Sequence, residues 1–355
     1  MISGYTEAHF PQTPTDPFPA MPHLTVILAM SALFTLAASG LVTGAESSEK
    51  VIRVGIIGTD TSHVPSFAKE IREGTKDPDL AGLRLVAAFP AGSPDFAPSR
   101  DRVAQFAKEL KGQGIEIVDS IDALLPLVDA VMIESVDGRV HLEQVRPVIA
   151  AKKLVFVDKP VAGSLADAIE IFRLAKEADV PCFSSSSLRY ATALEPLLAA
   201  KDKKQFLGCD VRGPCTYQPP LPDLYWYGIH SAEMLFALMG PGCESVTRVK
   251  TKDTDLVVGI WKDGRVGTLR GTRNGSKKFA VLVHDSKGGT PVEAASNSSG
   301  LMREVAKFFR TGKSPVDSGE TLEIFAFLDA AHESTRQNGA PIKLSDVMSN
   351  AASGK

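Results

Sequence analysis

Hydrophobic and polar residues follow two different patterns in the two halves of this chain. Between residues 51 and 184, short apolar runs rich in Val, Ile and Leu alternate with amphipathic stretches that carry apolar residues at helical spacing. Strands that alternate with helices predict a parallel, doubly wound sheet, because each crossover lays its helix on a face of the sheet. The expected strands are 51–57, 83–89, 115–118, 129–133, 154–157 and 180–184, and the expected helices are 64–74, 99–112, 141–152 and 165–178.

After Leu188 the pattern changes to longer β-type segments with few helices between them. Consecutive strands without helical crossovers predict a largely antiparallel sheet with helices on one face. The predicted fold class is α/β, with an N-terminal Rossmann-like doubly wound parallel sheet and a C-terminal α+β domain. The expected strands of the second part are 206–212, 245–251, 255–261, 265–271 and 279–285, and its expected helices are 227–240, 301–312 and 321–339.

These patterns divide the chain into four segments. Residues 1–45 are an export signal with an upstream extension, and 46–180 are a Rossmann-like domain of the dinucleotide-binding type. Residues 181–345 are an α+β domain for substrate binding and oligomerisation, and 346–355 are a tail that we expect to fray. A chain of 355 residues is long enough for two such cores.

An uninterrupted apolar stretch, 24–42, precedes the first domain, and the small-residue pattern after it ends at Ala45. This arrangement predicts an exported protein, periplasmic or extracellular, with Met21 as an alternative start. An uncleaved membrane anchor and a buried N-terminal helix are the alternatives, since 19 apolar residues can just span a bilayer. Without a twin-arginine pair the chain would cross unfolded, so it could not carry a cofactor bound in the cytoplasm.

Composition narrows the partners. The 44% hydrophobic and 23% charged residues are average for a globular protein, and a net charge of -3 gives no electrostatic reason to bind nucleic acid or acidic membranes. Small polar ligands are more consistent with this composition than nucleic acid or membranes are. Whether the chain forms a homo-oligomer is left open. The four cysteines lack the C-x-x-C spacing of a metal or redox site, so we expect separate buried thiols, with a Cys209–Cys215 bridge as the alternative.

The turn after the first expected strand reads GIIGTDTSHV, where a dinucleotide-binding turn has the glycines of G-x-G-x-x-G. The three positions are Gly58, Asp60 and His63. Asp60 places a carboxylate where a phosphate would lie, which costs about 4 kcal/mol at contact distance unless the side chain turns away or pairs with a cation. The amides of Thr59 and Thr61 can still hold a phosphate at the start of the helix.

The same turn has two other interpretations. Asp60, Thr61 and Ser62 are all good N-cap residues, so the turn needs no ligand at all. Alternatively, a polar group near Lys159 performs acid/base chemistry or binds a divalent cation; its members are Asp60, His63, Asp137 and His141. We assign no residue as a metal ligand from this pattern.

The end of the second expected strand also departs from a dinucleotide site. An acidic residue normally holds the adenine ribose there, but Phe89 and Pro90 occupy the position and Asp95 is the first carboxylate beyond them. An arginine suited to a 2′-phosphate is missing nearby until Arg100. Both ends of the adenosine diphosphate site are therefore altered.

Several longer stretches, in order and in register, resemble the Gfo/Idh/MocA family of glucose-fructose oxidoreductase, inositol dehydrogenase and MocA. They are 129–145, 158–180, 228–240 and 320–344, and the resemblance covers about residues 51–345. It implies a Rossmann domain followed by a substrate domain, hydride transfer on a carbohydrate, and NAD or NADP as the cofactor. The altered turn leaves binding of that cofactor open.

In that family a lysine of an E-K-P tripeptide lies between nicotinamide and substrate, and the matching residues here are Asp158, Lys159 and Pro160. An ammonium at the carboxyl edge of the sheet can bind a substrate hydroxyl and stabilise a developing alkoxide. The alternative is a lysine paired with a nearby carboxylate. The cofactor-binding residues that the resemblance implies are Gly58, Thr59, Asp60, Thr61, Asp137 and Lys159.

The second family feature is a histidine on a helix facing the cleft, which serves as acid/base, and His230 matches it. Trp226 stands where the family has an aspartate four residues earlier. Together with Tyr225 and Tyr227 it offers flat surfaces for stacking on a sugar. Glu233, at i+3, can orient His230. The alternative is a core histidine whose nitrogens are bound by the backbone.

Arg189 and Tyr190 match the family's segment between the two domains. Arg189 either contacts the substrate or forms an interdomain salt bridge.

Three functions are consistent with these residues. The first is an oxidoreductase of a sugar, polyol or related carbohydrate, in which Lys159 holds the oxygen and His230 takes the proton. The second is a lyase, hydratase or epimerase without nicotinamide, and the third is a carbohydrate-binding or partner-binding module without catalysis.

Overall fold

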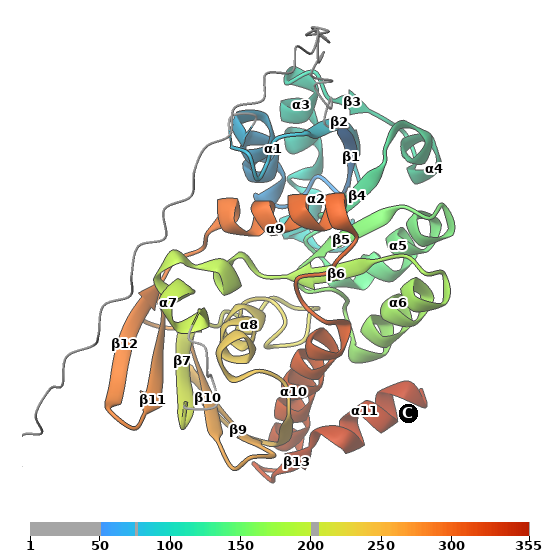
Figure 1. Cartoon of the computed structure of the whole chain (residues 1–355). Coiled ribbons are helices and arrows are strands. Elements are labelled where there is room, and N and C mark those ends of the chain that lie inside the picture. The colour runs from blue at the N-terminus through green and yellow to red at the C-terminus, as the bar shows by residue number, and fades with distance from the viewer. Residues whose placement is uncertain (1–50, 75–76, 200–205, 355) are drawn as a thin grey trace, which may run out of the picture. The chain divides into compact units, whose positions relative to one another are not determined.

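The computed structural model describes residues 51–74, 77–199 and 206–354, which belong to one compact unit (Figure 1). The predicted export signal at 24–42 lies outside these residues. None of the helices in the described ranges combines the length and the apolar character that a bilayer-spanning segment needs.

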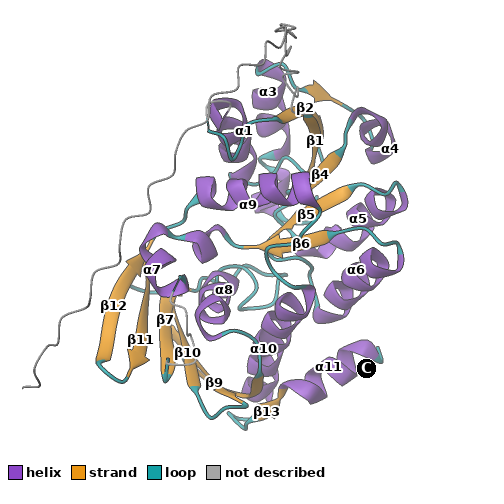
Figure 2. Ribbon diagram, in the orientation of Figure 1, coloured by secondary structure: helices purple, strands orange, loops and turns teal. Residues whose placement is uncertain are grey.

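Six parallel strands form the first sheet in the order β3-β2-β1-β4-β5-β6 (Figure 2). The order reverses between β1 and β4, so the carboxyl ends of these two strands form the switch point of a doubly wound sheet. The strands are β1 Ile52–Ile57, β2 Leu83–Phe89, β3 Glu116–Ile117, β4 Ala130–Ile133, β5 Leu154–Asp158 and β6 Cys182–Ser185.

Helices cover both faces of this sheet, because alternate residues of its buried strands point to opposite sides. Met132 and Phe156 pack with α1, whereas Val131 and Val155 pack with α5 and α6. The helices are α1 His63–Glu73, α2 Ala97–Arg100, α3 Val103–Gly112, α4 Ile121–Leu124, α5 His141–Ala150 and α6 Leu165–Glu177.

Local sequence explains where such a helix begins. The Ser164 side chain caps α6 by accepting a hydrogen bond from the amide of Asp167 at 3.1 Å. Leu165, Ala168 and Ile171 then follow at helical spacing and are buried against the sheet.

The second sheet has seven strands in the order β12-β11-β7-β10-β9-β8-β13. Its neighbours are antiparallel except for β7 and β10, which are parallel. Helices α8 and α10 pack on one face, so the predicted fold class is confirmed. The strands are β7 Gly208–Pro214, β8 Cys243–Lys250, β9 Thr254–Trp261, β10 Val266–Thr272, β11 Phe279–Asp285, β12 Gly288–Ala294 and β13 Ile342–Lys343, and the helices are α7 Glu195–Leu198, α8 Gly228–Met239, α9 Ser298–Thr311, α10 Ser318–Arg336 and α11 Leu344–Ala352.

Helix α9 returns to the first sheet, although it lies within the expected second segment, 181–345. Its apolar face packs with α1 and with the same sheet face (Figure 1). The ring centroids of Phe308 and Phe183 are 4.7 Å apart. The first sheet is therefore completed by residues from far along the chain.

The C-terminal tail differs from the prediction. Fraying of residues 346–355 is wrong for most of that stretch, because α11 runs to Ala352 and packs on α10 and α6. Leu344, Val347, Met348 and Ala351 fall on one face of this helix and reach the main core.

The four cysteines are separate, buried, free thiols, as expected. Cys209 lies in β7 and Cys215 follows the end of that strand. Six residues of strand span about 20 Å, far more than the roughly 7 Å that a disulfide allows between Cα atoms. The alternative of a Cys209–Cys215 bridge is therefore wrong.

Candidate active site

The turn after β1 lies directly against the turn after β4. Gly58 adopts a φ of 93°, and a Cβ built on it would be 2.4 Å from the Ser135 amide nitrogen. Only glycine fits this combination of a positive φ and close backbone approach. The first glycine of the altered fingerprint thus serves the packing of two strand ends.

Asp60 is fully buried between these turns rather than exposed to a ligand. Its Oδ1 accepts a hydrogen bond from the Val136 amide at 2.9 Å, and its Oδ2 accepts one from the Ser99 hydroxyl at 2.5 Å. Burial raises the pKa of Asp60 to about 6, although these hydrogen bonds favour the charged form. The side chain has turned inward, so the expected repulsion of a phosphate does not follow from its position.

The neighbouring threonines are also used internally. The Thr59 amide donates to the Ala91 carbonyl at 3.2 Å, and its hydroxyl donates to the Val103 carbonyl at 2.9 Å. The prediction that the Thr59 amide can hold a phosphate is therefore wrong in this arrangement. Of the three expected capping residues, only Thr61 approaches the role, with its hydroxyl 3.4 Å from the His63 amide.

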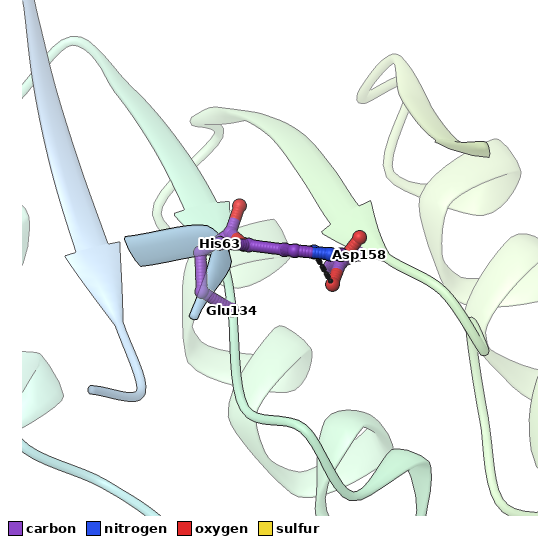
Figure 3. Close-up of side chains that lie close together, drawn as sticks. All are labelled: His63, Glu134 and Asp158. Atoms are coloured by element: carbon purple, nitrogen blue, oxygen red, sulfur yellow. Dashed lines mark hydrogen bonds and ion pairs between the residues drawn. The ribbon is translucent and has the colours of Figure 1, made fainter. Parts of the chain in front are cut away.

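Four ionisable residues gather at the carboxyl edge of the first sheet, and we call them the edge cluster: His63, Glu134, Asp158 and Lys159. His63 opens α1, Glu134 follows β4, and Asp158 ends β5 (Figure 3). The Nδ1 atom of His63 lies 2.7 Å from Asp158 Oδ2. Lys159 is 8% exposed, and no described residue forms an ion pair or hydrogen bond with its ammonium within bonding distance.

Glu134 is the unusual member of the edge cluster. It is completely buried, and neither of its carboxylate oxygens has a hydrogen-bond partner in the described part of the chain. Burial and the nearby Asp158 carboxylate raise its pKa well above the ordinary value. Burial acts on Asp158 in the same direction, but the cationic forms of His63 and Lys159 outweigh it and lower its pKa to about 2.

His230 approaches this edge from α8. Its Nδ1 atom is 2.7 Å from the Ser186 hydroxyl, which also accepts the Leu188 amide. Burial lowers the pKa of His230 well below its ordinary value, and the nearby positive charges of Lys159 and His63 lower it further. The structure thus brings Lys159 and His230 together, with His230 neutral near pH 7.

The three predicted aromatic residues have different positions. Tyr227 is 36% exposed and its ring is 5.8 Å from that of His230, and stacking of a sugar on this ring stays a prediction. Trp226 instead packs edge-on against Phe96 at 5.6 Å, in a small apolar cluster with Val136 and Leu221.

Tyr225 is not a substrate surface, because it is fully buried and its hydroxyl donates to Asp329 at 2.8 Å. It borders a separate cavity of about 720 Å³ between the start of α6 and helices α10 and α11, and no residue of the edge cluster lines that cavity.

Arg189 and Glu233 form a buried ion-pair network instead of contacting a ligand or orienting His230. Arg189 lies 2.8 Å from Glu233 and 2.6 Å from Glu320. The salt-bridge alternative for Arg189 therefore describes its position, and orientation of His230 by Glu233 is wrong. Tyr190 packs against the core under α9, where its carbonyl accepts the Asn297 side-chain amide at 2.9 Å.

Asp137 and His141 also lie apart from the edge cluster's contacts. Asp137 pairs with Arg139 at 2.7 Å, and Arg139 continues to Asp95 at 3.0 Å. His141 is buried, with Nε2 2.7 Å from the Ser135 carbonyl. The predicted group of Asp60, His63, Asp137 and His141 is therefore not formed, because Asp137 pairs with Arg139 and both ring nitrogens of His141 contact backbone carbonyls, those of Ser135 and Val161.

Two residues escaped prediction. Glu134 follows an apolar strand, just as Lys159 does, and a carboxylate directly after AVMI was an available signal. Ser186 lies in the SSSS run 184–187, which spans the end of β6, and nothing in the sequence distinguishes it from its neighbours.

The residues of this site would accommodate the nicotinamide end of a dinucleotide better than its pyrophosphate. At one end, Lys159 and His230 lie where a substrate oxygen could be held. At the other end, Thr59 and Asp60 have no exposed surface, because residues 91–99 bond to both of them. A pyrophosphate at this turn therefore requires residues 91–99 to move.

Comparison with known proteins agrees with the fold. Residues 52–186 match the model of the oxidoreductase family with an NAD-binding Rossmann fold that is named for Gfo, Idh and MocA. A myo-inositol 2-dehydrogenase of Thermotoga maritima is 29% identical over 189 residues, which are 46% of this chain and 56% of that protein. The match thus spans little more than half the length of this curated relative.

Two solved structures share the fold over most of the chain. A scyllo-inositol dehydrogenase from Lactobacillus casei superposes with a TM-score of 0.67 at 14% identity, covering 84% of this chain and 99% of that one. The WlbA dehydrogenase from Bordetella pertussis, solved with NADH and UDP-GlcNAcA, has a TM-score of 0.66 at 18% identity, covering 83% and 98%.

Proposed function

We propose that this chain is an oxidoreductase of the Gfo/Idh/MocA family, whose model residues 52–186 match, and that it oxidises or reduces a secondary alcohol of a carbohydrate with NAD or NADP. The substrate class follows from its relatives, which include dehydrogenases of myo-inositol and scyllo-inositol and a protein solved with a nucleotide sugar. A sugar, a polyol or a related carbohydrate is the expected substrate.

When bound, a nicotinamide accepts or supplies a hydride at the substrate carbon. The Lys159 ammonium holds the substrate oxygen and stabilises its negative charge as the hydroxyl proton departs. His230, neutral near pH 7, accepts that proton during oxidation and returns it to the oxygen during reduction. The contact with Ser186 fixes the imidazole ring through Nδ1 and directs Nε2 to this exchange.

The observation that carries this proposal is the meeting of Lys159 and His230 at one sheet edge. Lys159 follows Asp158, which pairs with Ser185 across β5 and β6. His230 of α8 lies 2.7 Å from Ser186, the residue after Ser185, so both side chains belong to the same edge of the sheet. The Lys159 ammonium also lowers the pKa of the His230 imidazole. Tyr227, beside His230, supplies an exposed ring on which a sugar can stack.

The test is a titration of the purified, folded chain with NAD and with NADP by calorimetry, followed by an assay for reduced cofactor with myo-inositol, scyllo-inositol and a panel of sugars. We expect saturable binding of one cofactor below about 1 mM and substrate-dependent reduction. Mass spectrometry of the denatured chain detects a cofactor that was retained during purification. Failure of the folded chain to bind either cofactor contradicts the proposal.

The buried turn at Thr59 and Asp60 favours a second candidate, an enzyme that transfers protons without nicotinamide. In that case Lys159 and His230 act beside a substrate carbonyl, as in a lyase, hydratase or epimerase. The same titration separates the two candidates, because this one expects turnover of a keto sugar without binding of NAD or NADP.

We also propose that the chain is exported and cleaved after Ala45, on the basis of the apolar stretch 24–42. N-terminal sequencing of the protein from its native host checks this, and we expect Glu46 as the first residue. A mature chain that still begins before residue 24 contradicts cleavage.

A further inference from the structure

We propose that His63, Glu134 and Asp158 form a binding site for one divalent transition-metal ion, with zinc as the expected occupant. This site is additional to the proposed hydride transfer and does not depend on it.

The three side chains are arranged as metal ligands. One potential ligand atom from each lies within 4.8 Å of the other two, and the donors are one imidazole nitrogen and two carboxylate oxygens. They come from the starts or ends of three different elements, α1, β4 and β5 (Figure 3). Three protein ligands with a remaining open position are typical of catalytic zinc sites.

Three of the four carboxylate oxygens of Glu134 and Asp158 lack a hydrogen-bond partner among the described residues. Both oxygens of Glu134 and Oδ1 of Asp158 are buried without a hydrogen bond within the described residues. A buried carboxylate oxygen without a partner is costly, and native proteins normally supply a donor or a metal ion. The only contact within the trio is that between His63 and Asp158, and it leaves Glu134 unsatisfied.

The charges around the trio favour a divalent cation. Glu134, Asp158 and the nearby Asp60 supply three negative charges when ionised, and Lys159 supplies one positive charge. A doubly charged ion balances the remainder when His63 is neutral. It would do so without a further counter-ion.

The donor types select the kind of ion. Calcium and magnesium prefer sites made of oxygen alone, whereas a mixed nitrogen and oxygen set suits zinc, manganese or ferrous iron. When the ion binds, the contact between His63 Nδ1 and Asp158 Oδ2 is replaced by a bond from each of these atoms to the ion. The ion then ties the turn after β1 to the ends of β4 and β5, so it is expected to stabilise the fold.

The experiment measures the metal itself. The full chain is stripped with a chelator, checked for a native circular dichroism spectrum, and titrated with zinc and manganese chloride by calorimetry. We expect one ion per chain, a higher melting temperature, and about a hundredfold weaker binding in Glu134→Gln. Cobalt substitution should give visible bands without a thiolate charge-transfer band, because no cysteine belongs to the site.

His284→Ala is the matched control. His284 also pairs with a carboxylate, Asp210, at 2.8 Å, but no third ligand lies beside that pair among the described residues. Its loss should leave zinc binding unchanged.

A folded wild-type chain that binds none of these ions overturns the proposal. Binding that Glu134→Gln leaves intact also overturns it. If Glu134→Gln fails to fold, the stoichiometry of the wild-type chain and the cobalt spectrum still decide the question.

Discussion

Two buried groups of charged residues in this protein differ in how completely their carboxylates are bonded. In the β8–β9 cluster, formed by Tyr217, Arg248, Asp255 and Arg273, both oxygens of fully buried Asp255 accept hydrogen bonds. In the edge cluster, Glu134 is equally buried but accepts none from the described residues. A saturated carboxylate maintains the fold, whereas an unsaturated one is available to a ligand.

The largest expected effect comes from removing the fully bonded carboxylate of the β8–β9 cluster. Asp255→Asn should lower the free energy of unfolding by about 3–5 kcal/mol, because it removes the charge that Arg273 shares with the buried Arg248 and leaves Arg248 only Asp223 at 3.5 Å. Urea unfolding followed by circular dichroism measures the loss. Asp263→Asn, which weakens an exposed pair with Arg265, should cost less than about 1 kcal/mol. Equal losses in the two variants would show that the buried carboxylate contributes no more to stability than the exposed one.

The next effect concerns chemistry. Lys159→Met should lower kcat/KM by about 10²–10³, because the developing charge on the substrate oxygen loses its cation. Unfolding should remain cooperative, since no described residue depends on this ammonium for a hydrogen bond. Steady-state assays measure the change, with exposed Lys69→Met as the control. Unchanged turnover in Lys159→Met would place this residue outside the chemistry.

Sequence patterns predicted the fold more fully than the site. The predicted strands 83–89 and 279–285 match β2 and β11 residue for residue, since apolar periodicity alone defines buried strands and helices. Family motifs also singled out Lys159, which follows a strand, and His230, which lies in α8, and their catalytic roles stay predictions.

The remaining contacts depend on tertiary structure. The sequence does not reveal that Trp226 meets Phe96 or that Arg189 meets Glu320, because these partners are distant along the chain. Nor does it show that the Asp60 side chain turns inward, which depends on the positions of Val136 and Ser99. The local sequence pattern was enough to single out individual residues, but it did not predict which distant residues contact each other.

The pH dependence of unfolding tests a third buried carboxylate, that of Asp60 beside the first sheet. The pKa of Asp60 rises from 3.8 to about 6 on folding, so its protonated form stabilises the native state. That stability is present below about pH 4 and is lost as the pH rises through 6, by up to about 3 kcal/mol. Wild-type stability relative to Asp60→Asn should therefore fall between pH 4 and 6 and stay level above about pH 7. Urea unfolding of both proteins checks this, and a pH-independent difference would contradict it.

The smallest effect tests a positioning residue. Ser186→Ala removes the hydroxyl that lies 2.7 Å from His230 Nδ1, and it should lower kcat by about tenfold, a fraction of the usual contribution of an acid or base. The pH profile of kcat should shift as well, because the imidazole loses a partner, and Ser186→Thr should restore part of the rate. A lower stability with an unchanged pH profile would indicate a purely structural role.

Helix α9 sets a limit on how the chain can be divided. Phe308 covers Phe183 on a sheet whose last strand ends at Ser185, more than a hundred residues earlier. Ser299 of the same helix bonds to Glu70 of α1, and Arg303 bonds to Asp77, which follows α1. A fragment that stops at residue 186 would leave this aromatic surface exposed, so we expect the segment that matches the family model, 52–186, not to fold on its own. During synthesis, that aromatic surface stays uncovered until α9 has been made.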